Sequence, residues 1–349
     1  MAKLLRYITV LIFVALMAAA LNISAAASDF HVKPKLPDNQ RQNGSTFFDL
    51  LVSPGQQQEL IIEISNLSEN DIVVLVEVLT ASTSRNGLIS YASKGEMDES
   101  LKFYFEDIAS LSQNQFELPA GVSIEVAINL RIPNEVFEGA ILGSIRVLRE
   151  VHQEEPDDDE GSINRYASVT AVRLVHSDNA EDIQPEFLLG EIKAVSINYK
   201  ASIIVPIRNT QPRIIQGAGA AARIYPKGSS DFILEQKFDN ISFAPNSIFP
   251  LSFIDEEGYE LNAGDYTAVV GVTFGNQSWN FEQDFIITEQ ATIEVIENAP
   301  NPNGSVFSLP EQGLSTWMWF AIAGGAAIII TVVGLIILLT RRRRAFPRF

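Results

Sequence analysis

The chain has 349 residues, no cysteine and a formal net charge of −18. An acidic surface of this kind repels nucleic acid and acidic wall polymers, so we expect no nucleic-acid partner. It favours cationic partners, and solubility alone is the simpler explanation of the same charge. Because disulfides are excluded, domains built from this sequence must be stable on their hydrophobic cores alone.

The first 27 residues have the pattern of a signal peptide. Lys3 and Arg6 form a positive start, residues 7–21 are apolar, and residues 25–27 are alanines at the cleavage positions, so we expect the mature chain to begin near Ser28. The alternative is a retained N-terminal anchor. Both interpretations place the following residues across the membrane.

Residues 317–339 are predicted to form one transmembrane helix. The stretch carries no charge, and its 23 residues at about 1.5 Å each cover a hydrocarbon core of about 30 Å. Trp317 and Trp319 stand where an interfacial aromatic belt would lie, and a run of arginines follows in the basic tail 340–349: Arg341, Arg342, Arg343 and Arg344. This order predicts an extracellular, wall-facing ectodomain, a cytoplasmic C-terminus, and contact of the helix and tail with membrane lipid.

The ectodomain between these segments reads as strands almost throughout. It holds 18 Lys and Arg against all 43 Asp and Glu, a net charge of −25. Apolar residues alternate with polar ones around Leu60–Ile64, Val122–Leu130, Tyr266–Phe274 and Phe281–Ile287, and short turn signals such as Asn86-Gly87 separate the strands. A period of two at this density predicts antiparallel sheets in an all-β fold of two tandem immunoglobulin-like sandwiches.

We divide the ectodomain into an N-terminal sandwich (28–176), a linker (177–183), a C-terminal sandwich (184–296) and a flexible stalk (297–316). The acidic run 154–161 is placed in a long hairpin loop of the first sandwich, because residues 166–175 read as a further strand. This run lacks the glycine and closing glutamate of a calcium loop, so whether it binds a cation stays open. Residues 261–266 resemble the approach to a tyrosine corner, with Tyr266 in a structural role.

Enzyme signatures are missing. Three histidines, His31, His152 and His176, have no partner at metal-ligand spacing, and no nucleophile elbow or zinc-protease motif occurs. We expect no catalytic residue, no metal and no cofactor, and a protein that binds through sheet edges or loops.

Motifs in both halves resemble one family. In the first half these are Phe30–Gln40, Phe47–Leu50, Ser53–Gln56, Ala81–Thr83, Asn86–Tyr91, Gly139–Gly143 and Asn164–Ala167, and in the second half Pro185–Gly190, Phe243–Ser247, Ala263–Tyr266 and Trp279–Phe281. In this order they resemble the N-terminal peptidoglycan-binding domain and the C-terminal host-binding domain of the WxL-interacting proteins of Gram-positive bacteria. The resemblance covers nearly the whole chain. The chain departs from the usual family pattern at Phe47 and Phe243, and these departures concern the fine specificity rather than the class.

The resemblance implies a membrane-anchored cell-surface adaptor whose partners are a WxL wall protein, peptidoglycan and host extracellular-matrix protein. The alternatives are a direct adhesin for host matrix proteins and a cell-wall glycan hydrolase. Candidate binding residues are Asn39, Gln40, Phe48, Asp49, Asn246 and Trp279. For the amides of Asn39 and Gln40, fixing a loop is as good an interpretation, and Trp279 continues a strand and fits a core position.

Overall fold

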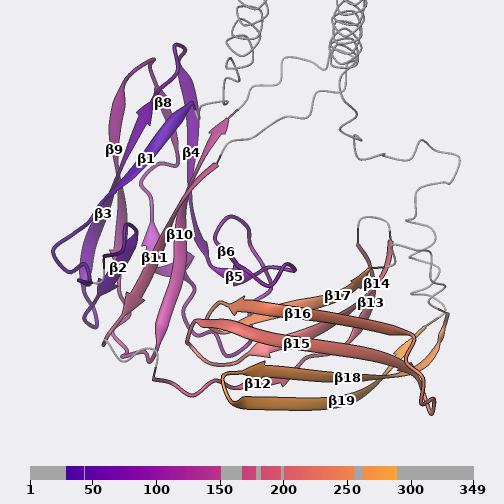
Figure 1. The fold of residues 1–349 in the computed structure, drawn as a ribbon. Helices are drawn as coiled ribbons and strands as arrows, with labels where there is room; N and C mark the ends of the chain where they lie inside the picture. Colours follow the sequence, from indigo (N-terminus) through magenta and orange to yellow (C-terminus); the bar gives the residue numbers. More distant parts are fainter. Residues whose placement is uncertain are drawn as a thin grey trace, which may run out of the picture. The chain divides into compact units, whose positions relative to one another are not determined.

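The computed structural model describes residues 29–42, 44–150, 167–177, 182–197, 200–254 and 262–288. The regular structure in these ranges is almost entirely β-strand, and it forms two sandwiches of paired sheets (Figure 1). The protein is therefore all-β in the part described. No helix in these ranges is both long and apolar enough to cross a membrane. The predicted signal peptide, stalk, transmembrane helix and basic tail lie outside them.

The first sandwich packs a four-stranded sheet against a five-stranded sheet. The four-stranded sheet has the order β1 (Phe30–Lys35), β3 (Gln57–Asn66), β9 (Ser123–Arg131) and β7 (Ala109–Ser110). The five-stranded sheet has the order β2 (Phe48–Leu51), β11 (Ala167–Val175), β10 (Ala140–Glu150), β4 (Ile72–Thr80) and β8 (Gln115–Leu118).

The alternation seen in the sequence is the alternation of burial. Leu60, Ile62 and Ile64 of β3 are fully buried, and Val126 and Ile128 of β9 lie in the same core. Successive side chains of a strand point to opposite faces, so this register puts one face of each sheet into the core. The predicted pattern of these strands is confirmed.

One pair of strands differs from the expected antiparallel arrangement. β2 lies parallel to β11, with Phe48 opposite Val172 and Leu51 opposite Val175. The chain leaves the four-stranded sheet after β1 and enters the other sheet at β2, and this crossover brings β2 alongside β11 in the same direction. Alternation alone carries no information about strand direction, which is why the sequence did not predict this pair.

The acidic run 154–161 lies outside the described residues. The strands on either side of it, β10 and β11, pair with each other antiparallel, from Ala140 opposite Val175 to Leu148 opposite Ala167. By this pairing β11 belongs to the first sandwich.

The segment between β4 and β9 contains several short elements. It includes a small hairpin, β5 (Ser82–Thr83) with β6 (Ile89–Ser90), and the single helical turn α2 (Phe105–Ile108). Phe105 is fully buried over Gly143 of β10, where a Cβ would lie 2.2 Å from its ring. Gly143 is therefore required by this close approach.

The second sandwich also has two sheets. In one, β14 (Lys200–Asn209) is paired along one edge with β17 (Ser247–Ile254), and along the other with β12 (Phe187–Leu189) and β13 (Lys193–Ile197). The other sheet has the order β16 (Leu234–Phe243), β15 (Ile215–Pro226), β18 (Gly264–Phe274) and β19 (Gln277–Ile287).

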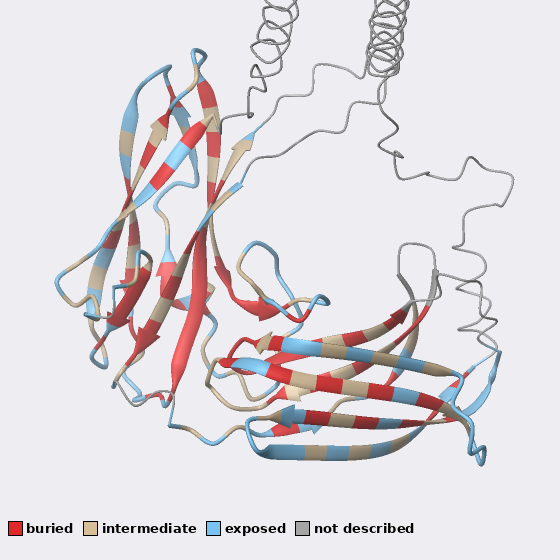
Figure 2. Ribbon diagram, in the orientation of Figure 1, coloured by how far each residue is buried: buried red, intermediate tan, exposed pale blue. Residues whose placement is uncertain are grey.

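Burial in the second sandwich alternates along β15 and β18 (Figure 2). Tyr266 is mostly buried, and its phenol donates a hydrogen bond to the Asn262 carbonyl at 2.8 Å. This is the geometry of a tyrosine corner, so the structural role predicted for Tyr266 is confirmed.

Candidate binding site between the sandwiches

A short segment of the first sandwich extends a sheet of the second. The amide of Asp98 donates to the Asn246 carbonyl at 2.9 Å, and the amide of Ile248 donates to the Glu96 carbonyl at 3.4 Å. Met97 and Ser247 form the bridge between them. Segment 96–98 thus covers part of the free edge of β17, and this satisfies main-chain groups that an exposed edge would leave unpaired.

Two buried hydroxyls join the sandwiches beside this edge. Thr83 Oγ1 accepts from the Ala244 amide at 3.0 Å and lies 2.6 Å from Ser247 Oγ. Ser247 Oγ donates its one proton to the Ala244 carbonyl at 2.7 Å, so Thr83 must be the donor to Ser247. Every hydroxyl in this network is matched, which is what a buried polar group requires.

Further contacts extend the interface on both sides. Ala140 N donates to Pro212 O at 2.8 Å, and Ser242 N donates to Gly87 O at 2.7 Å. A small apolar cluster packs between these bonds and comprises Ala81, Leu142 and Ala244, with Ile89, Tyr91 and Ile214 against them. The two sandwiches are therefore joined by main-chain bonds, side-chain bonds and an apolar cluster.

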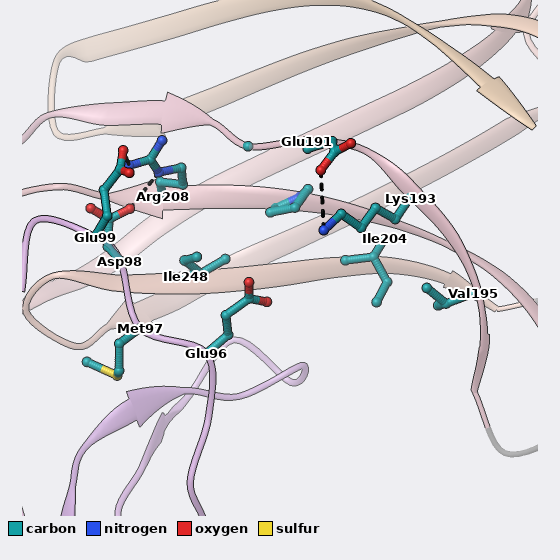
Figure 3. A pocket seen from close by; sticks show the side chains of 12 residues that line it. Glu96, Met97, Asp98, Glu99, Glu191, Lys193, Val195, Ile204, Arg208 and Ile248 are labelled. Carbon is teal, nitrogen blue, oxygen red and sulfur yellow. Dashed lines mark hydrogen bonds and ion pairs between the residues drawn. The ribbon is translucent and has the colours of Figure 1, made fainter.

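A charged pair closes one side of the interface (Figure 3). Arg208 Nε donates to Asp98 Oδ2 at 2.5 Å, and its NH2 donates to Glu99 at 2.6 Å. Burial raises the pKa of Asp98, but hydrogen bonds from Arg208 and Ser100 lower it by more, so the net pKa lies below its usual value. The same bonds raise the pKa of Arg208. Asp98 is therefore ionised and paired at neutral pH.

A groove of about 300 Å³ adjoins this pair on the outer face of the sheet that contains β14. Its apolar lining is formed by Met97, Val195, Ile204, Pro206 and Ile248. Carboxylates from both sandwiches stand around it (Figure 3): Glu96, Asp98, Glu99 and Glu191, with Lys193 Nζ 3.3 Å from Glu191. The groove is acidic at its rim, in keeping with the charge of the whole ectodomain.

A second cavity, of about 490 Å³, differs from this groove in the charge of its lining residues. The first sandwich contributes Phe47, Ile89, Tyr91, Leu142 and Arg173, and the second contributes Arg213, Ile214, Gln216 and Phe274. No carboxylate is among these lining residues. The cavity is therefore apolar and cationic within a strongly acidic chain.

The predicted site residues Asn39 and Gln40 fix a loop. Asn39 Nδ2 donates to the Leu51 carbonyl at 3.0 Å. Gln40 Nε2 donates to the Phe47 carbonyl at 3.0 Å, and its Oε1 accepts from the Asp49 amide at 3.2 Å. Both amides therefore hold the chain before β2 against β2, as the structural alternative expected.

Phe48 and Asp49 are adjacent to these amides and are buried. Phe48 is fully buried in the first core. Asp49 is 1% exposed, 3.3 Å from Arg41 NH1 and 3.9 Å from Arg173 NH1. The buried carboxylate thus lies between two cationic groups and offsets one of their two positive charges; one of these groups, Arg173, lines the cationic cavity.

Asn246 and Trp279 lie in different places. Asn246 is at the interface, where its Nδ2 donates to Ser100 Oγ at 2.9 Å and to the Thr210 carbonyl at 3.0 Å. The ring of Trp279 packs edge-on against Phe187, with ring centroids 5.0 Å apart, at the border of the second core. The structure thus groups the first four predicted residues near β2 and separates these two from them. The binding roles proposed for all six remain predictions.

Sequence reasoning missed the groups that join the sandwiches. Thr83, Asp98, Arg208 and Ser247 bond across the interface, and Arg213 enters the cavity beside it. A signal was present, because the motifs Ala81–Thr83 and Phe243–Ser247 both contain interface residues. Nothing in either motif says that the two meet.

Comparison with known families decides the identity of both halves. Residues 30–149 match the family described as WxL Interacting Protein, peptidoglycan binding domain, and residues 160–296 match WxL Interacting Protein, host binding domain.

The chain belongs to the WxL Interacting Protein family. The two domains occur in the predicted order, and both are described as binding domains. Their names imply a wall-associated protein of the cell surface with peptidoglycan and host ligands. A search of the curated proteins finds no match.

Solved structures give weak likenesses to this WxL Interacting Protein. The E. coli chaperone DraB is 15% identical, with 73% of this chain and 98% of that chain covered and a TM-score of 0.28. A chain from the Salmonella enterica SafA pilin and SafB chaperone complex is 12% identical, with coverages of 75% and 99% and a TM-score of 0.29. At these scores neither likeness supports a conclusion.

Proposed function

We propose that this WxL Interacting Protein is a membrane-anchored adaptor that holds a WxL wall protein against peptidoglycan. The observation that carries the proposal is the bonded interface between the two sandwiches. The main-chain bonds, the hydroxyls of Thr83 and Ser247 and the pair of Asp98 with Arg208 fix one domain on the other. A fixed pair of binding domains holds two ligands at a set distance, which is the requirement of an adaptor.

Retention assays test the adaptor role. The purified full chain, in detergent, is incubated with purified sacculi and separately with the WxL protein encoded nearest to it. We expect retention by both, and retention of the WxL protein on sacculi only when the chain is present. If the chain is retained by neither, the proposal is wrong. If muropeptides are released from the sacculi, the glycan hydrolase is the better explanation.

Anchoring by residues 317–339 is the second part of the proposal. Its support is the uncharged stretch of 23 residues flanked by Trp317, Trp319 and the four arginines 341–344. A chain ending at residue 316 should appear in the culture medium, while the full chain should sediment with membranes. Equal amounts in the membrane fraction would contradict the anchor.

Host attachment is proposed to be indirect. The stalk of about 20 residues spans roughly 25 Å, and each sandwich is on the order of 40 Å across. The far end then lies roughly 100 Å from the lipid, within a thick wall. Antibody to the sandwiches should label intact cells poorly and wall-stripped cells strongly, whereas equal labelling would favour a direct adhesin.

A further inference from the structure

The cationic cavity between the sandwiches differs from the rest of the molecule in its charge. The ectodomain has 18 Lys and Arg against 43 Asp and Glu, and long-range repulsion therefore opposes the approach of an anion. Binding of an anion at any place on this chain requires cations gathered locally and shielded from the surrounding carboxylates. The cavity lined by Arg173 and Arg213, without a lining carboxylate, meets that requirement.

Arg213 is the guanidinium available for a ligand. Its NH1 donates to the Ile183 carbonyl, and its guanidinium carbon lies 5.6 Å from the centroid of the Phe274 ring. Its Nε is buried and has no hydrogen-bond partner among the described residues. A buried donor without an acceptor is costly, and an acceptor supplied by a ligand would remove that cost. The guanidinium can therefore donate from its Nε to a ligand while NH1 keeps its bond to Ile183.

Arg173 is paired with a buried carboxylate. Its side chain is 11% exposed and lies 3.9 Å from the buried carboxylate of Asp49. Tyr91 lines the same cavity, where burial raises the pKa of its phenol and the nearby charge of Arg173 partly offsets this effect. The phenol is thus kept neutral and can donate a hydrogen bond at neutral pH.

The remaining walls are apolar. Phe47, Ile89, Leu142, Ile214 and Phe274 line the cavity, and its volume of about 490 Å³ is in the range of small-molecule sites. An inorganic anion would leave these walls in contact with water. A ligand with a small apolar group next to its charged end satisfies both the walls and the guanidinium groups.

We propose that this cavity binds the C-terminal carboxylate of a peptide whose last side chain is small and apolar. Arg213 and Arg173 take the carboxylate, Tyr91 donates to it or to the last carbonyl, and the apolar walls take the side chain. This inference rests on the proposed function in one respect: the stem peptides of peptidoglycan end in alanine and supply such a carboxylate in the wall. It also requires both sandwiches, since Arg213 belongs to the second.

Titration calorimetry with matched peptides tests the inference. The purified full chain in detergent is titrated with N-acetyl-D-alanyl-D-alanine, with the same dipeptide as its C-terminal amide, and with glycerol 3-phosphate. We expect the acid to bind about 10- to 100-fold more tightly than the amide, the range for a charged hydrogen-bond partner. Equal affinity for acid and amide, or tighter binding of glycerol 3-phosphate, would overturn the proposal.

Variants separate a ligand role from a structural one. Arg213→Gln should remove the preference for the acid, and Arg213→Lys should retain only part of it, because lysine lacks the forked geometry. The matched control is Arg223→Gln, since Arg223 also stacks on a ring, 5.3 Å from Phe232, and bonds Glu235 outside the cavity. We expect the control to keep the full preference.

A further variant covers the case in which Arg213→Gln does not fold. Gln216 is exposed at the cavity and leaves the Arg213 contacts intact, so Gln216→Glu should fold and weaken binding of the acid by about tenfold through repulsion. Unchanged binding of the acid by Gln216→Glu would count against the site.

Sacculus retention, measured in parallel, separates this inference from the proposed function. Retention together with a preference for the acid supports both. Retention without the preference overturns the carboxylate site and leaves wall binding in place. A preference for the acid without retention supports the site, and shows that its peptide comes from a source other than peptidoglycan.

Discussion

Substitution of Gly139 by alanine tests how strongly the interface stabilises the second sandwich on the first. Gly139 has a φ of +70°, and a Cβ there would lie 1.9 Å from the Pro212 carbonyl oxygen of the other sandwich. That oxygen accepts the hydrogen bond from the Ala140 amide at 2.8 Å. Because the clashing atom is a main-chain oxygen, a change of side-chain rotamer cannot relieve the clash. The two sandwiches must therefore separate locally.

The chain provides a matched control. Gly121 also has a φ of +70° but has no atom within 4 Å of an added Cβ. Gly121→Ala should therefore cost only the left-handed backbone conformation, about 1–2 kcal/mol. Gly139→Ala adds the loss of the Ala140 bond and leaves a buried amide unpaired, which costs about 1–3 kcal/mol more.

Urea unfolding of the segment 28–296 measures the difference. Trp279 is the one tryptophan between residues 28 and 296, so its fluorescence follows the second sandwich, while circular dichroism follows both. The two signals should coincide in the wild type and in Gly121→Ala, and should separate in Gly139→Ala. A difference between the two variants below about 0.5 kcal/mol, with coincident signals, would refute the reasoning.

Three further predictions concern polar groups. Tyr266→Phe removes the phenol of the tyrosine corner and should lower the free energy of unfolding by about 1 kcal/mol, whereas Tyr104→Phe at an exposed position should not change it. Asp49→Asn leaves two partly buried arginines without their shared, fully buried carboxylate and should cost about 3–5 kcal/mol; a loss under about 1 kcal/mol would contradict that role. In the folded state the pKa of Asp98 lies below its ordinary value of 3.8. Its pairing with Arg208 therefore stabilises the fold fully at pH values above 3.8, and this stabilisation is lost as the pH falls through the lowered pKa. Acid titration of stability should thus show a smaller loss below about pH 4 in Asp98→Asn than in the wild type, and equal losses would contradict it.

The strands and the tyrosine corner could be predicted because their signals are local. Alternation within β3, from Leu60 to Ile64, reports which side chains face the core, and Tyr266 bonds a carbonyl four residues away. Both depend on residues that are close in the sequence. The parallel pairing of β2 with β11 depends on strands more than a hundred residues apart, and alternation does not encode it.

The interface could not be predicted for a similar reason. Thr83 and Ser247 are 164 residues apart, and each is an ordinary hydroxyl until the fold brings them together. The amides of Asn39 and Gln40 present a different difficulty. An amide uses the same donor and acceptor for a sugar, a partner or its own main chain, so residue type alone left the alternatives open. The bonds to the Leu51 and Phe47 carbonyls account for both side chains.

The bonds between the sandwiches also bear on mechanical load. A force that pulls the two sandwiches apart passes through two parallel links. One is the covalent connection between β11 and β12, and the other is the set of short contacts from Thr83 to Ser247 and from Ala140 to Pro212. The non-covalent link is the weaker one and yields first, while the chain itself stays intact. Because its contacts are non-covalent, we expect the interface to open under such a load and to form again when the load is removed.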